Sequence, residues 1–328
     1  LALADAPYVV GVDAVDGGVV GDDRCGQATV FCFIQRITEE DADKGIPAVR
    51  AQRLGFGDYA RFADAWNRIW TYRRIRGTSR LPQTGDMTVQ NWGYSSGLGE
   101  GGNDYPFGYL FKTKQETASE ANDWHGGVRL DVLAAAERRA LAWHCWFKKN
   151  APVDIGAERV ALATDALGTS RGLAKMPYIR DTRRSVGLDD LMLTMSHIAY
   201  SSARSTGVCF SDRVALGAYA VDVHPLVDCQ YPDYVRQEQR TAPFYIPFRS
   251  LTNRRYGNLL VAGKTMAQSF QANSATRLHP TEWSTGVAAG VAATHMAEEN
   301  LTTQFARDHI EQIQRRITKY APVDWTID

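Results

Sequence analysis

The stretch NLLVAGKTMAQSFQANSATRLHPTEWSTGVAAGVAA, residues 258–293, constrains the fold more than any other part of the sequence. The continuous apolar run 259–262 predicts a strand buried on both faces. A polar loop over 268–274 comes next, and then a helix with Pro280 in its first turn, where helices tolerate proline. A strand, a loop and a helix in this order predict an α/β fold, with some α+β character elsewhere in the chain.

The predicted helix concentrates its smallest side chains on one face, where residues recur at spacings of three and four: Gly286, Ala289, Gly290, Ala293 and Ala297. Glycine inside a helix costs about 1 kcal/mol relative to alanine, so we expect something to approach this face closely. Tight packing of the helix against a sheet explains the pattern. Approach of an electron-rich ligand to the N-terminal turn explains it as well, and the two are compatible. Gly263 marks the carboxyl end of the strand, the edge at which α/β sheets bind ligands.

Charge and hydropathy exclude two classes of protein. The 328 residues have a formal net charge of zero, which argues against a nucleic-acid-binding protein. Three basic runs, 71–80, 180–184 and 252–257, are short and separated, which favours solvated faces or anion contacts. No apolar run approaches the ~18 residues of a membrane span. There is no HExxH motif, paired-cysteine motif or tight His/Asp cluster, so we expect no metal site.

The five cysteines are scattered and form no CxxC pair. This pattern favours a reduced, cytoplasmic location, while export stays open because a signal peptide would lie upstream. The chain opens LALADAPYVVGV without an initiator methionine. We therefore expect a fragment, or one chain of a split protein.

Periodicity predicts further elements along the chain: a strand at 28–37, a core helix at 55–75, a glycine-rich loop at 93–109, a long amphipathic helix at 128–152, mixed β structure with a short helix at 184–194 and 207–226, and a closing amphipathic helix at 302–320. Residues 97–102 formally match G-x-G-x-x-G. We reject a dinucleotide fingerprint there, because the preceding TVQNWGYSS is not a buried strand and the next segment, NDYPFGY, contains Pro106 and has no helical period.

Several motifs occur together in a fixed order. They are ALADAPYVVG (2–11), Asn91-Trp92 with Gly102-Asn103-Asp104-Tyr105, RDTRRSVG (180–187), Gly217-x-Tyr219-x-x-Asp222-x-His224, Pro247-x-Arg249-Ser250-Leu251, NLLVAGK (258–264), Arg277-x-x-Pro280-Thr281 and Gly286-x-Ala288-Ala289-Gly290. With these motifs the sequence resembles FAD-dependent oxidoreductases of the glutathione-reductase-like class, some of whose members are named "xanthan lyase"-like. The motifs resemble the C-terminal two-thirds of such an enzyme, and the N-terminal dinucleotide fingerprint of the family is absent.

The resemblance implies an FAD/NAD(P)-binding-like fold, with FAD as cofactor and a small-molecule substrate. Residues 1–255 would form a substrate-binding region with β-sheet and a helical insert, residues 256–300 would complete the FAD-binding domain, and residues 301–328 would form the closing helix. A second polypeptide would supply the N-terminal half, unless the sequence is truncated.

The resemblance also implies roles for individual residues. The residues expected to bind the cofactor are Ala262, Gly263, Arg277, Pro280, Thr281, Gly286, Ala288, Ala289 and Gly290. His224 and His279 are the candidate bases, because the pKa of histidine lies near neutral pH. Asp222 stands two residues before His224, so on a strand both would face the same side and the carboxylate would orient the imidazole. A structural role for either histidine stays open.

Substrate contacts are expected on the basic run and on the glycine-rich loop. Arg183 and Arg184 would clamp an anionic or polyhydroxylated substrate, since guanidinium makes paired hydrogen bonds to oxygens. Salt bridges to neighbouring carboxylates account for them equally. Asn103, Asp104 and Tyr105 would line the substrate side of the site, or simply form a turn.

The reaction predicted from these features is hydride transfer between a flavin and a small polar organic substrate, such as a sugar derivative or a carboxylate. Two alternatives stay open at this point. One is a non-catalytic subunit or fragment, and the other is a flavin-independent carbohydrate lyase.

Overall fold

The computed structural model describes residues 1–14, 21–40, 65–93, 102–120, 124–229 and 238–321. Contacts divide the chain into two compact units. Unit 1 comprises residues 1–27, 111–127 and 180–328, and unit 2 comprises 28–110 and 128–179. Both units mix helix and strand, and the pairs between named strands in the described residues are antiparallel. The mixture agrees with the predicted α/β fold with α+β character.

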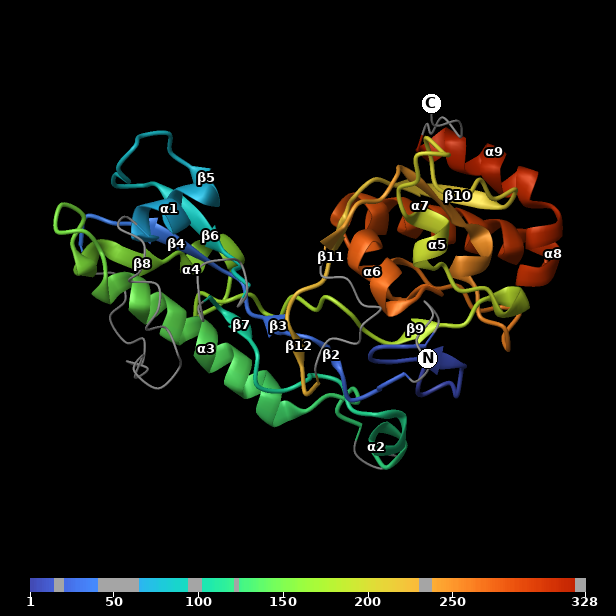
Figure 1. The fold of residues 1–328 in the computed structure, drawn as a ribbon, viewed down its shortest axis with the longest axis horizontal. Helices are drawn as coiled ribbons and strands as arrows, with labels where there is room; N and C mark the ends of the chain where they lie inside the picture. Colours follow the sequence, from blue (N-terminus) through green and yellow to red (C-terminus); the bar gives the residue numbers. More distant parts are fainter. Residues whose placement is uncertain (15–20, 41–64, 94–101, 121–123, 230–237, 322–328) are drawn as a thin grey trace. The chain divides into compact units, whose positions relative to one another are not determined.

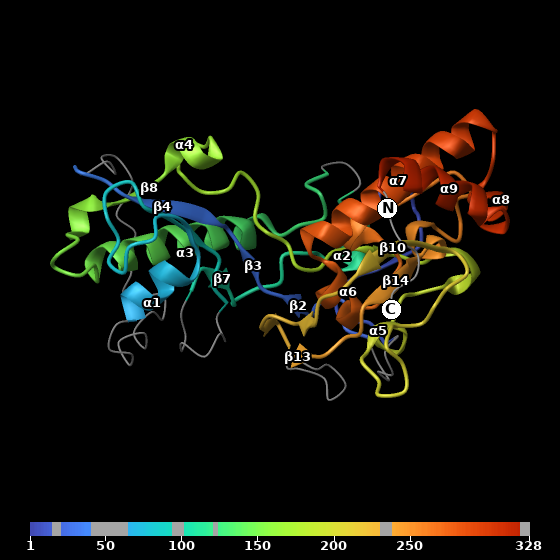
Figure 2. The ribbon, with the colours of Figure 1, turned by 90° about the horizontal axis from the view of Figure 1, so that it is seen from above.

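Unit 2 is built on a four-stranded sheet with the order β5-β6-β4-β8. Its strands are β3 (Thr29–Val30), β4 (Phe33–Ile37), β5 (Arg74–Arg76), β6 (Met87–Gln90), β7 (Asp104–Tyr105) and β8 (Val160–Leu162). Its helices are α1 (Ala65–Tyr72), α3 (Leu130–Lys149) and α4 (Thr164–Leu167), with a 3-10 turn at Ala157–Arg159. Figures 1 and 2 show α3 running along the sheet.

Aromatic side chains hold α1 and α3 together in unit 2. Trp66 and Trp70 stack with ring centroids 5.1 Å apart, and Trp143 stacks on Trp146 at 4.8 Å. Phe147 meets members of both pairs edge-on. Offset and edge-to-face pairs of this kind add to the stabilisation from burial alone. The tryptophans at helical spacing are therefore core residues, as the periodicity predicted.

Unit 1 packs helices against a β-ribbon formed by β10 (Arg213–Gly217) and β14 (Phe244–Pro247). Its other strands are β1 (Tyr8–Val9), β2 (Gly26–Gln27), β9 (Arg184–Ser185), β11 (Val221–Asp222), β12 (Leu226–Val227) and β13 (Glu238–Gln239). Its helices are α2 (Lys114–Ala118), α5 (Met195–Ile198), α6 (Phe270–Thr276), α7 (His279–Glu298), α8 (Thr303–Asp308) and α9 (Ile310–Tyr320), with 3-10 turns η4 (Leu188–Asp190), η5 (Phe248–Leu251) and η6 (Gly263–Thr265). Both α7 and α9 contact β10 (Figure 2).

The predicted buried strand at 259–262 is wrong. These four residues are only half-buried, and their single ladder contact is an isolated bridge from Leu260 to Thr252. An apolar run forms a buried strand only where neighbouring strands pair with it, and no named strand in the described residues does so. Leu260 and Val261 instead pack as side chains against the core of unit 1.

The predicted polar loop is also wrong in its second half, because residues 270–276 form α6. Ser269 caps this helix, its Oγ accepting a hydrogen bond from the backbone N–H of Ala272 at 3.1 Å. Phe270, Ala272 and Ala275 then bury their side chains in the core. A few buried apolar residues between polar ones are enough to fix a short helix, although the composition resembles a loop.

Four other predicted helices are found at least in part. The helix expected at 128–152 is α3, and the helix after Pro280 is α7. The closing helix at 302–320 is divided into α8 and α9 at His309, whose φ of −121° and ψ of 39° are not helical. Of the helix expected at 55–75, residues 55–64 lie outside the described range, and 74–76 form a strand. The rejected glycine match at 97–102 also lies outside, except for Gly102.

Cys25 and Cys229 form a disulfide across 204 residues, with Cα atoms 5.4 Å apart. They flank the paired strands β2 and β12, which they therefore clamp together. No spacing in the sequence predicts this pair. Disulfides persist in oxidising compartments, so the pair weighs against the reduced compartment that the cysteine pattern favoured. Among the described residues, no helix is both long and apolar enough to span a membrane.

Candidate functional site

Asp222 is the centre of a polar cluster at the end of β11. Its Oδ2 atom lies 2.8 Å from Nη2 of Arg277, 3.4 Å from Nε2 of His224 and 3.3 Å from the hydroxyl of Tyr219. We call these four residues the Asp222 cluster. The alternation of a strand predicted that Asp222 and His224 would lie on the same side, and the structure brings their side chains into contact.

The charge of Asp222 is fixed by its neighbours. Burial alone would raise the pKa of the carboxyl group, since it removes water from the charged form. The hydrogen bond from His224 and the positive charges around the group, of which Arg277 is one, outweigh burial and hold the pKa of Asp222 well below its usual range. Asp222 is therefore a permanent anion at neutral pH, as the orienting partner of a basic imidazole must be.

Two buried residues from distant parts of the chain fix the position of the cluster. Arg277 caps the C-terminal end of α6, is 3 % exposed and also donates to the backbone oxygen of Asp222 at 3.0 Å. Gln27 in β2 accepts a hydrogen bond from the backbone N–H of His224 at 2.9 Å. The imidazole itself keeps 19 % of its surface exposed. The site therefore has a rigid frame and an accessible ring.

The Asp222 cluster adjoins the start of α7. Arg277 precedes the first helical residue, His279, by two positions. On the other side, a Cβ atom added to Gly217 at the end of β10 would lie 3.2 Å from Oγ1 of Thr281 in the first turn. Thr281 is buried, whereas His279 and Pro280 are exposed. The cluster and the N-terminal turn of α7 therefore form one neighbourhood within unit 1.

The Gly263 turn lies against the second turn of α7. Gly263 has a φ of +60°, in the left-handed region that favours glycine, and its N–H donates to Oγ1 of Thr285 at 3.1 Å. The next residue, Lys264, forms an ion pair with Glu282 at 3.0 Å. Ala262 is half-buried beside this turn. Gly263, which was predicted to end a strand, therefore lies next to the predicted helix, although residues 259–262 do not form that strand.

The glycine–alanine face of α7 is open. Gly286, Gly290, Ala293 and Ala297 are exposed and Ala289 is half-buried. A Cβ atom added to Gly286 or Gly290 would meet no atom within 4 Å. The expectation that another element packs tightly on this face is therefore wrong for the described part of the chain. The core side of the helix is lined by other residues: Thr281, Thr285, Ala288, Ala292, His295 and Met296.

Ala288 needs a correction as a cofactor contact. It is completely buried in the core of unit 1. Successive helical residues turn by about 100°, so Ala288 lies about 200° from both Gly286 and Gly290 and faces the opposite side of α7. The sequence motif groups the three residues, but the helix separates them.

Arg184 and Arg183 are placed differently from one another. Arg184 is fully buried, and its guanidinium bonds to Asp13 at 2.8 Å and to several backbone oxygens. It ties parts of unit 1 together and, so buried, is not positioned to clamp a substrate in the way expected from the sequence. Arg183 is only partly buried, donates to the backbone oxygen of Gly127 at 2.7 Å, and lines a cavity of about 210 Å³ that Thr265 of η6 also lines.

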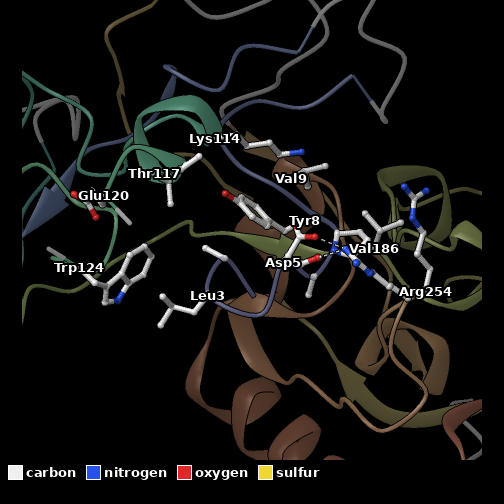
Figure 3. Close-up of a pocket in the computed structure, with 15 residues that line it drawn as sticks. Leu3, Asp5, Tyr8, Val9, Lys114, Thr117, Glu120, Trp124, Val186 and Arg254 are labelled. Atoms are coloured by element: carbon white, nitrogen blue, oxygen red, sulfur yellow. Dashed lines mark hydrogen bonds and ion pairs between the residues drawn. The ribbon is translucent and has the colours of Figure 1, made fainter. Parts of the chain in front are cut away.

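A larger cavity adjoins that one and shares lining residues with it, and part of its wall comes from the motif ALADAPYVVG (2–11). It measures about 790 Å³, and Tyr8, Lys114 and Trp124 contribute to its wall (Figure 3). The ammonium group of Lys114 lies 5.1 Å from the centre of the Tyr8 ring. The lining residues of the cavity come from four sequence-distant segments of unit 1, namely residues 2–9, residues 114–120 with Trp124, Val186, and residues 254–255. A single sequence does not show that such segments meet.

The three candidates on the glycine-rich loop belong to unit 2. Asn103 is fully buried and bonds to the backbone of Trp92, Phe31 and Gln90. Asp104 is buried in β7, and Tyr105 packs edge-on against Phe107. For Asn103 the structure favours the structural interpretation, because its amide holds three segments of unit 2 together.

Comparison with protein families identifies one match. The family model described as FAD dependent oxidoreductase matches residues 1–317. Searches of curated proteins and of solved structures return no significant match. The cofactor that this family implies is FAD.

The described residues fit one end of such a cofactor. The open glycine–alanine face of α7 and the Gly263 turn expose backbone where a flat ring can approach, and no side chain of the described residues fills that space at Gly286 or Gly290. A glycine-rich turn from a strand into a helix, which would hold the pyrophosphate, is not found in the ranges that the structure describes.

Proposed function

The chain belongs to the FAD dependent oxidoreductase family, and on that premise we propose that it transfers hydride between FAD and a small polar organic substrate. A sugar derivative or a carboxylate fits the polar and cationic groups around the site. The observation that carries the proposal is that His224 and Arg277 both contact Asp222 beside the start of α7. A flavin supplies the hydride acceptor or donor when bound, and the protein supplies position and proton transfer.

His224 is the base in this proposal. Oxidation of an alcohol or amine carbon by hydride loss requires that the attached hydroxyl or amine lose a proton. The imidazole of His224 is accessible, and Asp222 holds the ring from one side while Gln27 holds the backbone of the same residue. Asp222 stabilises the imidazolium that forms, as a buried carboxylate does in other His–Asp pairs.

His279 is the weaker candidate for the base. It is exposed at the first position of α7, and its side chain is not joined to the Asp222 cluster by any contact that the structure shows. A base must be held within hydrogen-bond reach of the proton that it removes. We therefore assign the proton transfer to His224.

The residues proposed to hold the flavin are Gly263, Ala262, Ala289, Gly286 and Gly290, with Thr281 and Pro280 at the start of α7. Arg277, just before that helix, is proposed to support them. The N-terminal turn of α7 carries a partial positive charge, which favours electron-rich groups. Small side chains allow backbone to approach such a group. Arg183 is proposed to contact the substrate, since its cavity also reaches Thr265 in η6. Asp104 and Tyr105 stay proposals without structural support.

We further propose that the pyrophosphate of FAD is held outside the described residues. The holder would be another segment of the same protein or a second polypeptide. Mixing the purified chain with FAD, removing free flavin and recording the visible spectrum tests whether this chain alone retains the cofactor. Retention only after a second polypeptide is added would support the split arrangement.

A substitution on the open face tests the position of the flavin. Gly290→Leu would cover the exposed backbone, and Leu has the higher helix propensity, so the folded protein should be no less stable than the wild type. We expect retained flavin absorbance to fall at least tenfold in Gly290→Leu. Gln312→Leu, which places an exposed leucine on α9 instead, is the control and should keep the absorbance. In the form of the protein that retains FAD, with the second polypeptide where it is needed, equal flavin retention by both variants and the wild type would refute this position for the cofactor.

The reaction class is tested by anaerobic mixing of the flavin-loaded protein with a panel of sugars and hydroxy acids. Bleaching of the flavin absorbance by one of them supports hydride transfer. Release of an unsaturated product with no electron acceptor and no bleaching would contradict it and favour a lyase.

A further inference from the structure

Unit 2 contains a basic cavity that the proposed function does not use. The cavity measures about 1060 Å³ and lies between α1, the strand β5 and the loop 77–81. Three arginines line it, Arg68, Arg74 and Arg80, together with the hydroxyl residues Thr71, Thr78 and Ser79. No carboxylate is among the described lining residues. The wall therefore combines positive charge with hydrogen-bond donors.

Arg74 has buried donors that the protein does not satisfy. One end of its guanidinium, Nη1, donates to the backbone oxygen of Ser79. The atoms Nε and Nη2 are buried and find no hydrogen-bond partner in the described residues. Buried donors on a charged group are expensive to leave unpaired, and the great majority of them in proteins have a partner. Nε and one Nη atom are a pair of donors that matches two oxygens of an oxyanion.

The backbone around Arg74 is irregular in a way that builds this cavity. Between Arg74 and Arg76 the register of β5 against β6 shifts, as in a β-bulge. Bulges bend a strand and redirect a side chain, and they are frequent next to binding sites. Gly77 comes next with a φ of +96°, and a Cβ atom there would lie 2.0 Å from Oδ1 of Asp86. The tight turn brings residues 78–80 back alongside Arg74.

We propose that this cavity binds a small ligand through a phosphate or sulfate group, with Arg74 as the anchoring residue. Three arginines lining one cavity suit a tetrahedral anion with two negative charges better than a single carboxylate. The hydroxyl side chains supply further donors to its remaining oxygens. The basic run 71–80, which in the sequence is compatible with either a solvated face or anion contacts, is thereby assigned to anion contacts.

Titration with inorganic phosphate and inorganic sulfate tests the proposal, because both present the same chemistry without an organic body. Each is added to the full chain at constant ionic strength, with chloride as the balancing salt, and binding is followed by calorimetry and by the melting temperature. We expect saturable binding of phosphate, sulfate or both, and no equivalent effect of chloride. A preference for one of the two identifies the group on the ligand.

Arg74→Gln should weaken that binding at least about tenfold, the effect of losing one charge-assisted hydrogen bond. Arg76→Gln is the matched control, since Arg76 lies on the same strand, is exposed, and is not among the residues that line the cavity. It removes the same charge and should leave the affinity within about twofold, because an exposed charge that makes no hydrogen bond to the anion contributes little in water. Equal losses in both variants would show general charge attraction and overturn the proposal.

A structural role for Arg74 is separated from binding by two further measurements. If Arg74 only ties the loop through Ser79, Arg74→Gln lowers the melting temperature. In that case neither anion raises the melting temperature of the wild-type protein, and this result overturns the proposal. If Arg74→Gln does not fold, Arg80→Gln replaces it, because Arg80 is exposed, and should weaken the anion binding several-fold. None of these measurements uses FAD, so their outcome is independent of the proposed hydride transfer.

Discussion

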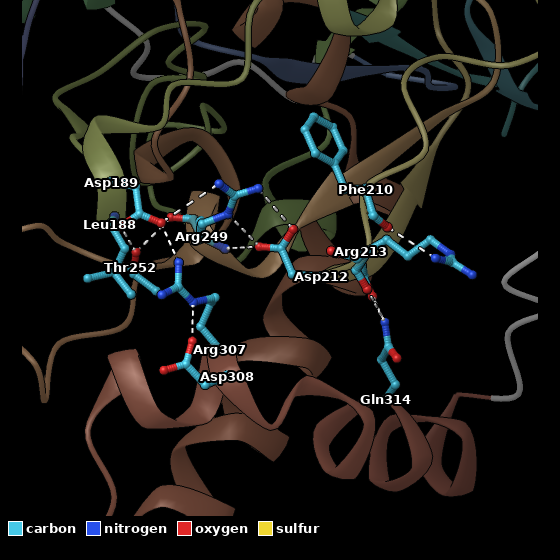
Figure 4. A network of polar contacts seen from close by, with 11 residues as sticks. Leu188, Asp189, Phe210, Asp212, Arg213, Arg249, Thr252, Arg307, Asp308 and Gln314 are labelled. Carbon is cyan, nitrogen blue, oxygen red and sulfur yellow. Dashed lines mark hydrogen bonds and ion pairs between the residues drawn. The ribbon is translucent and has the colours of Figure 1, made fainter.

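Unit 1 contains two groups in which aspartate pairs with arginine, and the two groups differ in burial and in the other residue types that they include. One is the Asp222 cluster. The other, here called the Asp212 network, joins Asp189, Asp212, Arg249, Arg307 and Asp308 (Figure 4). Both groups contain residues from the sequence motifs on which the resemblance to the family was based. Their difference separates residues that maintain the fold from residues that are accessible for chemistry.

In the Asp212 network the central carboxylate is buried and hydrogen-bonded. The side chain of Asp212 is 3 % exposed and accepts hydrogen bonds from the N–H of Arg249 at 3.1 Å and from its Nε at 2.9 Å. The hydrogen bond to Asp212 raises the pKa of Arg249, so the pair stays charged. The network fastens η5 to η4 and α8, and all five of its members are aspartates or arginines.

The Asp222 cluster, by contrast, includes a histidine and a tyrosine and reaches the surface. The side chain of Asp222 keeps 38 % of its surface exposed, and that of His224 keeps 19 %. A fixed anion beside an accessible imidazole is an arrangement that can move a proton. The comparison predicts that the two groups respond differently to substitution.

The largest effect is expected from His224→Gln. Loss of a general base typically lowers the rate by about 10²–10⁴, and glutamine keeps the size of the side chain. The rate of flavin reduction by the active substrate, followed by stopped-flow absorbance, should fall by that factor while the melting temperature hardly changes. His279→Gln is the comparison variant. A larger loss in His279→Gln than in His224→Gln would reverse the assignment of the base.

Asp212→Asn should produce the largest change in stability. Asparagine has nearly the same shape but removes the buried charge that faces Arg249, which keeps only its longer pair with Asp189 at 3.8 Å. Breaking a buried pair in this way costs about 3 kcal/mol. Urea denaturation measures the change. The rate of flavin reduction per folded molecule should stay close to that of the wild type. A normal stability with a reduced rate would mean that the Asp212 network belongs to the site.

Local patterns in the sequence identified the long elements and part of the site. Helical periodicity predicted α3 and α7, and the spacing of two predicted that Asp222 and His224 face the same side. The apolar run 259–262 misled, because hydrophobicity does not reveal whether a partner strand is present. The motif that includes Ala288 misled for a different reason: neighbours in a helical sequence point in different directions, and only the core shows which side is buried.

The rest of the site depends on contacts over long sequence distances. Gln27 reaches His224 across 197 residues, and the disulfide joins Cys25 to Cys229. Arg183 and Arg184 are adjacent in the sequence, yet one is a buried tie and the other lines a cavity. A single sequence contains no signal for such pairs, since they arise from packing of segments that have no local relationship.

The acid stability of the protein is a third way to test the comparison, with a smaller expected effect. The folded pKa of Asp222 is depressed from an ordinary value of 3.8, so its ion pairs stabilise the fold above that value. That contribution is lost as the pH falls below 3.8 through the folded pKa. Asp222→Asn lacks this contribution at every pH.

The urea midpoints of wild type and Asp222→Asn should therefore differ most at neutral pH and converge as the pH falls below 3.8. Because the side chain of Asp222 is partly exposed, the difference at neutral pH should be smaller than the one caused by Asp212→Asn. A gap that stays constant down to the acid transition would show that the carboxylate does not gain stability from its charged partners.

The smallest effect is expected from Asp190→Asn, which removes an exposed ion pair close to the Asp212 network. The side chains of Asp190 and Arg254 are 73 % and 52 % exposed. Asp190 has a φ of +56°, a conformation that asparagine also adopts readily, so the substitution adds no backbone strain. The stability should change by less than about 1 kcal/mol, because water screens an exposed pair. A loss of stability as large as that of Asp212→Asn would show that arginine contacts stabilise unit 1 regardless of burial. Burial could then no longer be used to separate the structural carboxylates of unit 1 from its reactive ones.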